Sequence, residues 1–160
     1  MSAGPDPQPT RPPRPPRPLR ADYVAWRTVT TRWRDDDAYG HLNNATYYEI
    51  FDTAVNAHLF EATGLDIRRL PAIGVVAETS CRYFTEMRFP APIEAGLVVE
   101  RLGRSSVVYR IGLFQGPGEQ AAAEGRFVHV YVDDTDPARP VTAVPPVVRE
   151  AVEPLVPGSG

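Results

Sequence analysis

The sequence predicts an α+β domain in which an antiparallel β-sheet wraps around one long central α-helix. Three observations lead to this prediction. Residues 45–63 have helical periodicity and follow a first segment of strand composition. Four more segments of strand composition then extend to residue 134, and short Gly-containing links join the last three. A helix with so broad an apolar face must be covered, and a curved sheet is an economical cover.

The chain is predicted to hold a single domain behind an N-terminal tail. Residues 1–21 are expected to form a disordered Pro/Arg-rich tail, because this stretch lacks hydrophobic periodicity, and residues 22–160 the domain. Residues 4–20 contain four Arg and one Asp, a charge of +3, which leaves −6 on the rest of a chain whose net charge is −3. An acidic body argues against general binding to nucleic acid.

The sequence also bears on the cellular compartment. We find no apolar stretch of membrane-spanning length and no apolar core of a secretory signal, so we expect a cytoplasmic protein without membrane association. A single cysteine, Cys81, excludes an internal disulfide framework.

Along the chain, the first strand is predicted at residues 23–34, which are rich in β-branched and aromatic residues. In the helix, Tyr47, Ile50, Phe51 and Ala54 recur at spacings of three and four, over a length of about 28 Å. Asn43 or Asn44 is expected to cap its first turn, and Gly64 to end it in a left-handed conformation.

The remaining elements are predicted to be mostly strands. Their expected ranges are 72–84, 93–103, 105–115 and 121–134, and the short links between the last three favour an antiparallel meander. A short helix is expected at 145–155, since proline is tolerated at a helix start.

The segment DDDAYGHLNN, residues 35–44, places acidic side chains where the first strand gives way to the helix. If the strand continues through Asp37, Asp35 and Asp37 project to one face and Asp36 to the other. The free N–H groups of the helix start would then lie near these carboxylates. Such amides can stabilise an oxyanion while a carboxylate attacks or activates water. The alternative, that Asp37 only caps a turn and complements the helix dipole, stays open.

The segment DDDAYGHLNNATYYEIFD, with the following helix and meander, resembles the hotdog-fold acyl-CoA thioesterases, and in particular their 4-hydroxybenzoyl-CoA thioesterase type. Asp35, Asp37 and Gly40 match the Asp-x-Asp-x-x-Gly pattern of that group, and HLNN is similar to a motif of plant acyl-carrier-protein thioesterases. The resemblance implies a hotdog fold and hydrolysis of an acyl-CoA to free acid and CoA, with no cofactor and no metal.

The resemblance also implies roles for individual residues. Asp37 matches the catalytic carboxylate, and the backbone N–H at or next to Asn44 matches the oxyanion donor. His41 is a further candidate of the catalytic site, where it would hold the loop or orient Asp37 or the attacking water. Asn43 and Tyr47 are candidates for substrate binding.

A short run before the penultimate strand contacts CoA in members of this family. The run GRSS stands in that place, so Arg104, Ser105 and Ser106 are candidates for contact with the phosphates or the pantetheine. An ordinary turn is the alternative interpretation of the same residues.

The chain departs from the members with aromatic substrates, which have an aromatic residue where it has Asn43 and Asn44. A fatty or other acyl group therefore stays open, as does the choice between CoA and acyl carrier protein as its carrier. The resemblance implies a homodimer or homotetramer with its sites at the subunit interface.

Four alternatives are kept. The domain could bind acyl-CoA without hydrolysing it, or Asp37 and His41 could serve as the proton-transferring pair of an enoyl-CoA hydratase. Glu49 or Asp52 on the helix could be the working acid in place of Asp37. Asp35, Asp37 and His41 could also ligate a divalent metal ion.

Overall fold

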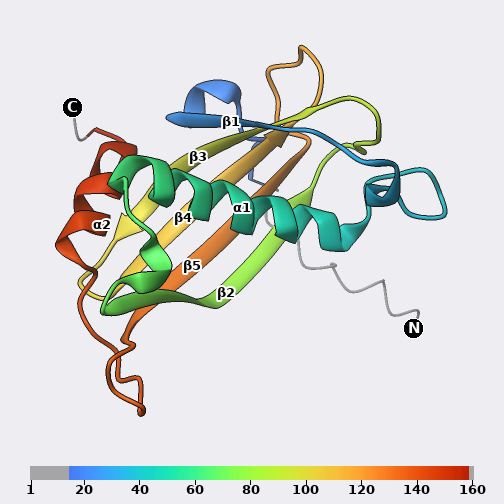
Figure 1. Ribbon diagram of the computed structural model, residues 1–160. Helices are drawn as coiled ribbons and strands as arrows, with labels where there is room; N and C mark the ends of the chain where they lie inside the picture. Colours follow the sequence, from blue (N-terminus) through green and yellow to red (C-terminus); the bar gives the residue numbers. More distant parts are fainter. Residues whose placement is uncertain (1–14, 159–160) are drawn as a thin grey trace, which may run out of the picture.

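A five-stranded antiparallel sheet curves around one long helix in the computed structural model, which describes residues 15–158 (Figure 1). The order of strands in the sheet is β1-β3-β4-β5-β2, and all neighbours are antiparallel. The elements are β1 (Ala25–Val29), α1 (Asn44–Thr63), β2 (Ala72–Tyr83), β3 (Ile93–Leu102), β4 (Ser106–Phe114), β5 (Ala123–Asp133) and α2 (Pro146–Val152). The predicted α+β class and hotdog arrangement are confirmed.

The central helix begins and ends where its sequence signals place it. The Asn43 side chain caps the first turn by accepting a hydrogen bond from the Ala45 N–H at 2.9 Å. At the other end Gly64 adopts φ 66°, a left-handed conformation that glycine takes without steric cost. Both predicted signals are confirmed, and of the two candidate caps it is Asn43 that acts.

One face of α1 packs on the concave face of the sheet. Ile50, Phe51, Val55 and Leu59 of the helix are nearly inaccessible to solvent. Phe51 lies over Gly125 of β5, where a β-carbon would come within 2.5 Å of its ring. The missing side chain at Gly125 therefore sets how closely the helix approaches the sheet.

The first strand is shorter than predicted. β1 ends at Val29, and residues Trp33–Asp35 form a 3-10 turn, so that the acidic segment does not continue the strand. Asp35, placed in that turn, is buried, and its backbone oxygen accepts the Asn43 N–H at 2.7 Å. The alternation of faces expected for residues 35–37 is therefore wrong.

The structure also moves the boundary of the predicted tail. Residues 15–21, which we expected in the tail, lie against the sheet. The Arg17 guanidinium donates to the Ala121 oxygen at 2.8 and 3.0 Å and to the Thr85 hydroxyl at 2.6 Å. Arg20 pairs with Glu94 at 2.6 Å. Composition suggested an unstructured stretch, but arginine can anchor such a stretch through its several donors. Residues 1–14 of the tail lie outside the described residues.

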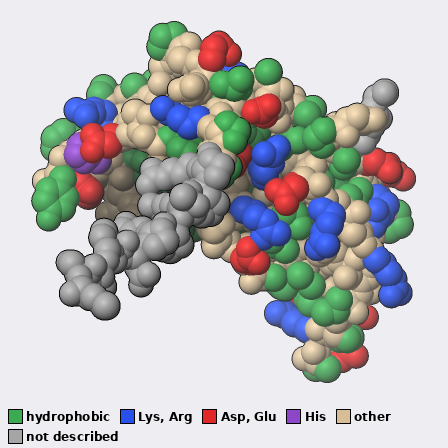
Figure 2. Space-filling view, turned by 180° about the vertical axis from the view of Figure 1, so that it is seen from behind, with side chains coloured by type: hydrophobic (Ala, Val, Ile, Leu, Met, Phe, Trp, Pro, Cys, Tyr) green, Lys and Arg blue, Asp and Glu red, His purple; other side chains and the backbone are tan. Residues whose placement is uncertain are grey.

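The convex face of the sheet carries a network of charged side chains. Glu124, which is buried, accepts hydrogen bonds from Arg82 and from the Tyr23 hydroxyl, both at 2.6 Å. Figure 2 shows acidic and basic side chains interspersed over this side of the molecule. Burial, followed by the bond to Glu124, raises the pKa of Tyr23, so the phenol stays neutral and donates.

Gly125→Ala should destabilise the protein by about 1–3 kcal/mol, because the added methyl group meets Phe51, whose ring is fully buried and cannot move aside. The measurement is urea unfolding followed by circular dichroism. Gly118→Ala is the matched control, since a β-carbon there has no atom within 4 Å. Equal stability of the two variants would show that the helix does not depend on this close approach.

Candidate active site

An open cleft lies where the N-terminus of α1 meets the end of β2. Its volume is about 470 Å³. We call it the Asp37 cleft. It is lined by Asp37, His41, Leu42, Asn44, Tyr47, Tyr83, Phe84, Thr85 and Glu86. The structure thus brings together four of the residues that the sequence singled out: Asp37, His41, Asn44 and Tyr47.

The loop between the 3-10 turn and α1 holds the Asp37 carboxylate at the cleft. Its Oδ1 accepts the Tyr39 N–H at 2.8 Å and the His41 N–H at 3.3 Å. The loop closes through the Asp37 N–H, which donates to the His41 oxygen at 2.8 Å, and Gly40 turns at φ 77°. Both of these hydrogen bonds are accepted by Oδ1. Among residues 15–158 no group donates to Oδ2, so this is the carboxylate oxygen that is available to a substrate.

The three consecutive acids have separate partners. Asp35 pairs with Arg32 at 2.8 Å, away from the cleft. The carboxylate of Asp36 accepts the Phe89 N–H at 3.1 Å, which ties the loop to the segment before β3. Only Asp37 lines the cleft. This division of roles could not be derived from the sequence, since three adjacent Asp residues look alike in it.

Burial opposes ionisation of Asp35, but the hydrogen bonds and charge of Arg32 outweigh burial and lower the pKa of this carboxyl group. Asp35 is therefore ionised in the folded protein. Its ion pair and its backbone contact to Asn43 together fix the entry of the chain into α1.

The first turn of α1 presents an available backbone donor. The Asn43 N–H donates to Asp35, the Ala45 N–H to the Asn43 side chain, and the Thr46 N–H to the Asn43 oxygen. Among the described residues these bonds leave the Asn44 N–H without an acceptor, as expected for a helix start. Asn44 itself is exposed and lines the cleft.

The floor and far wall of the cleft are aromatic. Tyr47 is buried and stacks edge to face with Tyr83, with 5.0 Å between ring centroids. The Tyr83 hydroxyl donates to the Asn44 side-chain oxygen. Burial raises the pKa of Tyr47 to about 12, so its phenol is neutral at physiological pH and can donate a hydrogen bond.

His41 does not pair with Asp37 through its ring. Its Nε2 lies 3.0 Å from Glu86 Oε2 on the opposite wall. A hydratase would need the imidazole and the carboxylate to act as a pair, and this geometry does not provide one. The contact instead ties the loop after Asp37 to the segment that follows β2.

Two groups of predicted residues lie elsewhere. Asn43 serves as the helix cap and does not line the cleft. Arg104, Ser105 and Ser106 lie at the β3–β4 turn, at the opposite end of the sheet from the cleft within one chain. The backbone of this turn is held there, since the Arg104 oxygen accepts the Val144 N–H and the Ser105 oxygen accepts the Tyr131 N–H.

The alternative acids on the helix are also placed away from the cleft. Glu49 lines a separate hollow beside Arg32 and Asp35, and Asp52 bonds to Asn56 at 3.0 Å on the exposed face of α1. No group of three His, Cys, Asp or Glu side chains among residues 15–158 is arranged to hold a metal ion.

Residues 83–86 form one wall of the cleft, and they were not predicted from the sequence. A usable signal was present, however. The helix runs about 30 Å away from the cleft, and the twelve residues of β2 that follow its end run back over about 40 Å. The end of β2 must therefore return to the start of α1 (Figure 1).

Comparison with known proteins gives the family. A model of the thioesterase-like superfamily matches residues 31–152, which include the whole Asp37 cleft. The chain belongs to this superfamily. The membership confirms the predicted thioester hydrolase. The finer assignment to the 4-hydroxybenzoyl-CoA type stays a prediction. None of the curated proteins compared with the sequence matches it.

Solved structures agree with the fold. The PA5185 protein of Pseudomonas aeruginosa strain PAO1 is 47% identical, with a TM-score of 0.84 over 91% of this chain and 100% of that chain. The PA2801 protein of Pseudomonas aeruginosa, named as a candidate thioesterase, is 29% identical, with a TM-score of 0.72 over 81% and 98% of the two chains.

A more distant structure shares the fold alone. The 1,4-dihydroxy-2-naphthoyl-CoA thioesterase Slr0204 of Synechocystis is 13% identical, with a TM-score of 0.71 over 79% of this chain and 93% of that chain. In the part of this chain that is described, no helix combines the length and the apolar character needed to cross a membrane.

Asp35→Asn should destabilise the protein by about 1.5–3 kcal/mol at pH 7, through the loss of charge-assisted hydrogen bonds to Arg32. Because folding lowers the pKa of Asp35, its contribution is complete above the unfolded value of about 3.9 and is lost as the pH falls through the folded value. The difference in the free energy of unfolding between wild type and variant should therefore decrease below about pH 4.

The measurement is urea unfolding of both proteins at a series of pH values. Asp52→Asn, which changes an exposed acid of α1, is the control and should change stability by less than about 0.5 kcal/mol at pH 7. If the difference in the free energy of unfolding between wild type and Asp35→Asn stays constant from pH 7 down to pH 2, the role given to the Arg32 ion pair is contradicted.

Proposed function

We propose that the protein is an acyl-CoA thioesterase in which Asp37 supplies the catalytic carboxylate and the Asn44 N–H the oxyanion donor. The observation that carries the proposal is that one open cleft is lined by both Asp37 and Asn44: among residues 15–158, Oδ2 of the Asp37 carboxylate has no donor and the Asn44 N–H at the helix start has no acceptor. Membership of the superfamily supports hydrolysis of a thioester, and the residues that line the cleft support Asp37 and the Asn44 N–H as the groups that perform it.

In this mechanism the thioester carbonyl accepts a hydrogen bond from the Asn44 N–H, and the positive end of the α1 dipole favours the negative charge that develops on its oxygen. Asp37 then acts by one of two routes. It takes a proton from water as the water oxygen bonds to the carbonyl carbon, or it bonds to that carbon itself and forms an anhydride that water cleaves. In both routes the C–S bond breaks and the sulfur takes up one proton of the water, so that the thiol and the free acid leave.

The two ties across the cleft support this assignment. The His41–Glu86 contact and the Tyr83–Asn44 hydrogen bond each join the side that carries Asp37 to the wall formed after β2. They hold the loop and the helix start in fixed relation, which a positioned carboxylate and oxyanion donor require. A module that only binds acyl-CoA has no need of an ionisable carboxylate at the thioester.

Asp37→Asn should lower kcat by about 10²- to 10⁴-fold, the usual contribution of a positioned acid or base. Asn retains an Oδ1 acceptor for the Tyr39 and His41 N–H groups, so the loop should keep its geometry. The measurement is thiol release from short-chain, long-chain and aromatic acyl-CoAs, followed by acyl-carrier-protein substrates.

Glu49→Gln is the matched control, because this acid lies in the first turns of α1 but outside the cleft. It should retain wild-type turnover. Full activity of Asp37→Asn together with an inactive Glu49→Gln would move the catalytic role to the helix acid. Absence of hydrolysis by the wild type with every substrate would favour the binding module.

We further propose that two copies associate along β2. This strand is a sheet edge twelve residues long, and the residues at its centre are exposed. Such an edge presents unpaired backbone groups to another strand. Val76 lies opposite His129 of β5, hence on the helix side of the sheet, yet it is 48% exposed. A second copy would cover it, in a pairing where each copy offers the same strand.

Val76→Lys should shift the protein from dimer to monomer, because the interface would have to bury two ammonium groups close to its symmetry axis. The measurement is size-exclusion chromatography with light scattering. Val141→Lys is the control: Val141 is also exposed, at 64%, but lies outside β2. A dimer that survives Val76→Lys and dissociates in Val141→Lys would place the interface elsewhere.

A further inference from the structure

A second cavity lies at the other end of α1, remote from the Asp37 cleft. Its volume is about 180 Å³, and we call it the His129 cavity. It is lined by Asn56, Leu59, Ile67, Arg68, Leu70, Ala72, Ile73, Gly74, His129, Tyr131 and Val148. Asn56 and Leu59 follow Asn44 by three to four helical turns, so within one chain the cavity lies about 20 Å along the helix from the catalytic amide.

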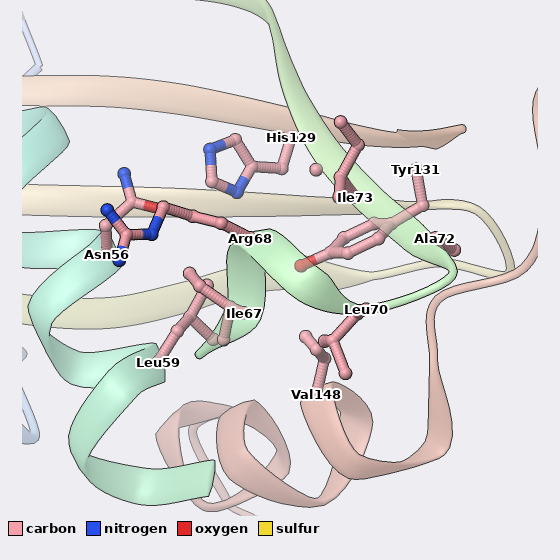
Figure 3. A pocket seen from close by; sticks show the side chains of 11 residues that line it. Asn56, Leu59, Ile67, Arg68, Leu70, Ala72, Ile73, His129, Tyr131 and Val148 are labelled. Atoms are coloured by element: carbon pink, nitrogen blue, oxygen red, sulfur yellow. The ribbon is translucent and has the colours of Figure 1, made fainter. Parts of the chain in front are cut away.

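The cavity has apolar walls and a polar side. Leu59, Ile67, Leu70 and Val148 face it from one side (Figure 3). From the opposite side the imidazole of His129 and the phenol of Tyr131 extend from β5 toward the same space. A few polar groups that converge on an apolar hollow are the usual form of a small-molecule site.

His129 is the feature that points to a ligand. Its side chain is only 2% exposed, and its Nδ1 has no hydrogen-bond partner among the described residues. Burial lowers its pKa to about 4, so the ring is neutral at physiological pH. Buried polar atoms are nearly always hydrogen-bonded in folded proteins, and one left over beside a cavity calls for an occupant that can bond to it.

The space around the imidazole is kept open by glycine. A β-carbon at Gly74 of β2 would lie 2.9 Å from His129 Nδ1, too close for any other residue. Aromatic rings surround the imidazole on its remaining sides, with Phe127 at 5.0 Å and Tyr109 at 5.8 Å between ring centroids. These neighbours hold the ring in place and offer its Nδ1 no hydrogen bond.

We propose that the His129 cavity is a binding site for a compact, mostly apolar molecule that carries a hydroxyl group, of which phenol is the simplest probe. The volume fits this class, since a buried cavity of about 150 Å³ accommodates benzene. A hydroxyl group both donates and accepts, so it satisfies the imidazole in either neutral tautomer. The site goes beyond the thioesterase assignment and does not depend on it.

The test compares phenol with toluene, which has nearly the same size and shape but no hydroxyl group. Binding to the isotope-labelled full chain is measured by NMR titration, and contacts to the methyl groups of Leu59 and Val148 locate the ligand. Wild type should bind phenol about tenfold more tightly than toluene, the effect of one additional hydrogen bond to a buried group.

His129→Leu should reverse this preference, because leucine removes the imidazole that pairs with the hydroxyl group and sets an apolar side chain in its place, which still admits toluene. Ile67→Trp, which places a larger side chain at the half-buried rim of the cavity, should weaken the binding of both phenol and toluene. Glu49→Gln is the control and should leave both affinities unchanged, because Glu49 lines neither this cavity nor the Asp37 cleft. The readout is ligand binding, so failure of the thioesterase proposal does not affect it.

Three outcomes would overturn the proposal, and the first two need only the wild-type protein. They are tighter binding of toluene than of phenol, ligand contacts outside the cavity, and an unchanged preference for phenol in a folded His129→Leu protein. A crystal soaked with phenol whose structure shows only an ordered water at Nδ1 would also overturn the proposal.

Discussion

The seating of α1 in the concave sheet is the contact on which the rest of the structure depends. Phe51 occupies the space left by Gly125, and this close approach sets the height of the helix over the sheet. The position of the helix axis then determines where the two ends of α1 lie. Its N-terminus opens into the Asp37 cleft, and its last turns form part of the His129 cavity. A helix that stood farther from the sheet would change the shape of both sites.

The helix start shows how a short polar segment is divided between structure and chemistry. Asp35 is used for folding, because its carboxylate holds Arg32 and its backbone oxygen holds Asn43. Asp36 fastens the loop to the chain before β3. These two contacts fix the loop from both sides, so that Asp37 can remain half-buried with one oxygen uncommitted. The reactive position is thus supported by neighbours of the same residue type.

The sequence predicted what depends on local physics. Helix α1 was located to within one residue, because its apolar period and the signals at Asn43 and Gly64 act over a few residues. The meander of β3 to β5 followed from short links. The predicted end of the first strand was wrong, since the turn at Asp35 is held by contacts with Arg32 on one side and Asn43 on the other, which strand composition does not reveal. The anchoring of residues 15–21 by Arg17 depends on Ala121 and Thr85, which no local pattern connects to the tail.

The same limit applied to the sites. Asp37, His41, Asn44 and Tyr47 are close in sequence and could be grouped by motif, whereas Tyr83 and Glu86 reach the cleft only because β2 runs back along the helix. Arg104, Ser105 and Ser106 matched a family position, but within one chain they lie at the far end of the sheet. His129 looked like an ordinary packed histidine, and only its unpaired Nδ1 beside a cavity distinguishes it.

The strand that returns along the helix also relates the two sites to each other. β2 begins at the His129 cavity, with Ala72 to Gly74, and ends at the Asp37 cleft, with Tyr83. When two identical strands pair antiparallel about a two-fold axis at their centre, the first residues of one copy lie opposite the last residues of the other. The pairing of two β2 strands proposed above would therefore set the His129 cavity of one copy beside the Asp37 cleft of its partner. Sites that are about 20 Å apart along one helix would become neighbours across the interface.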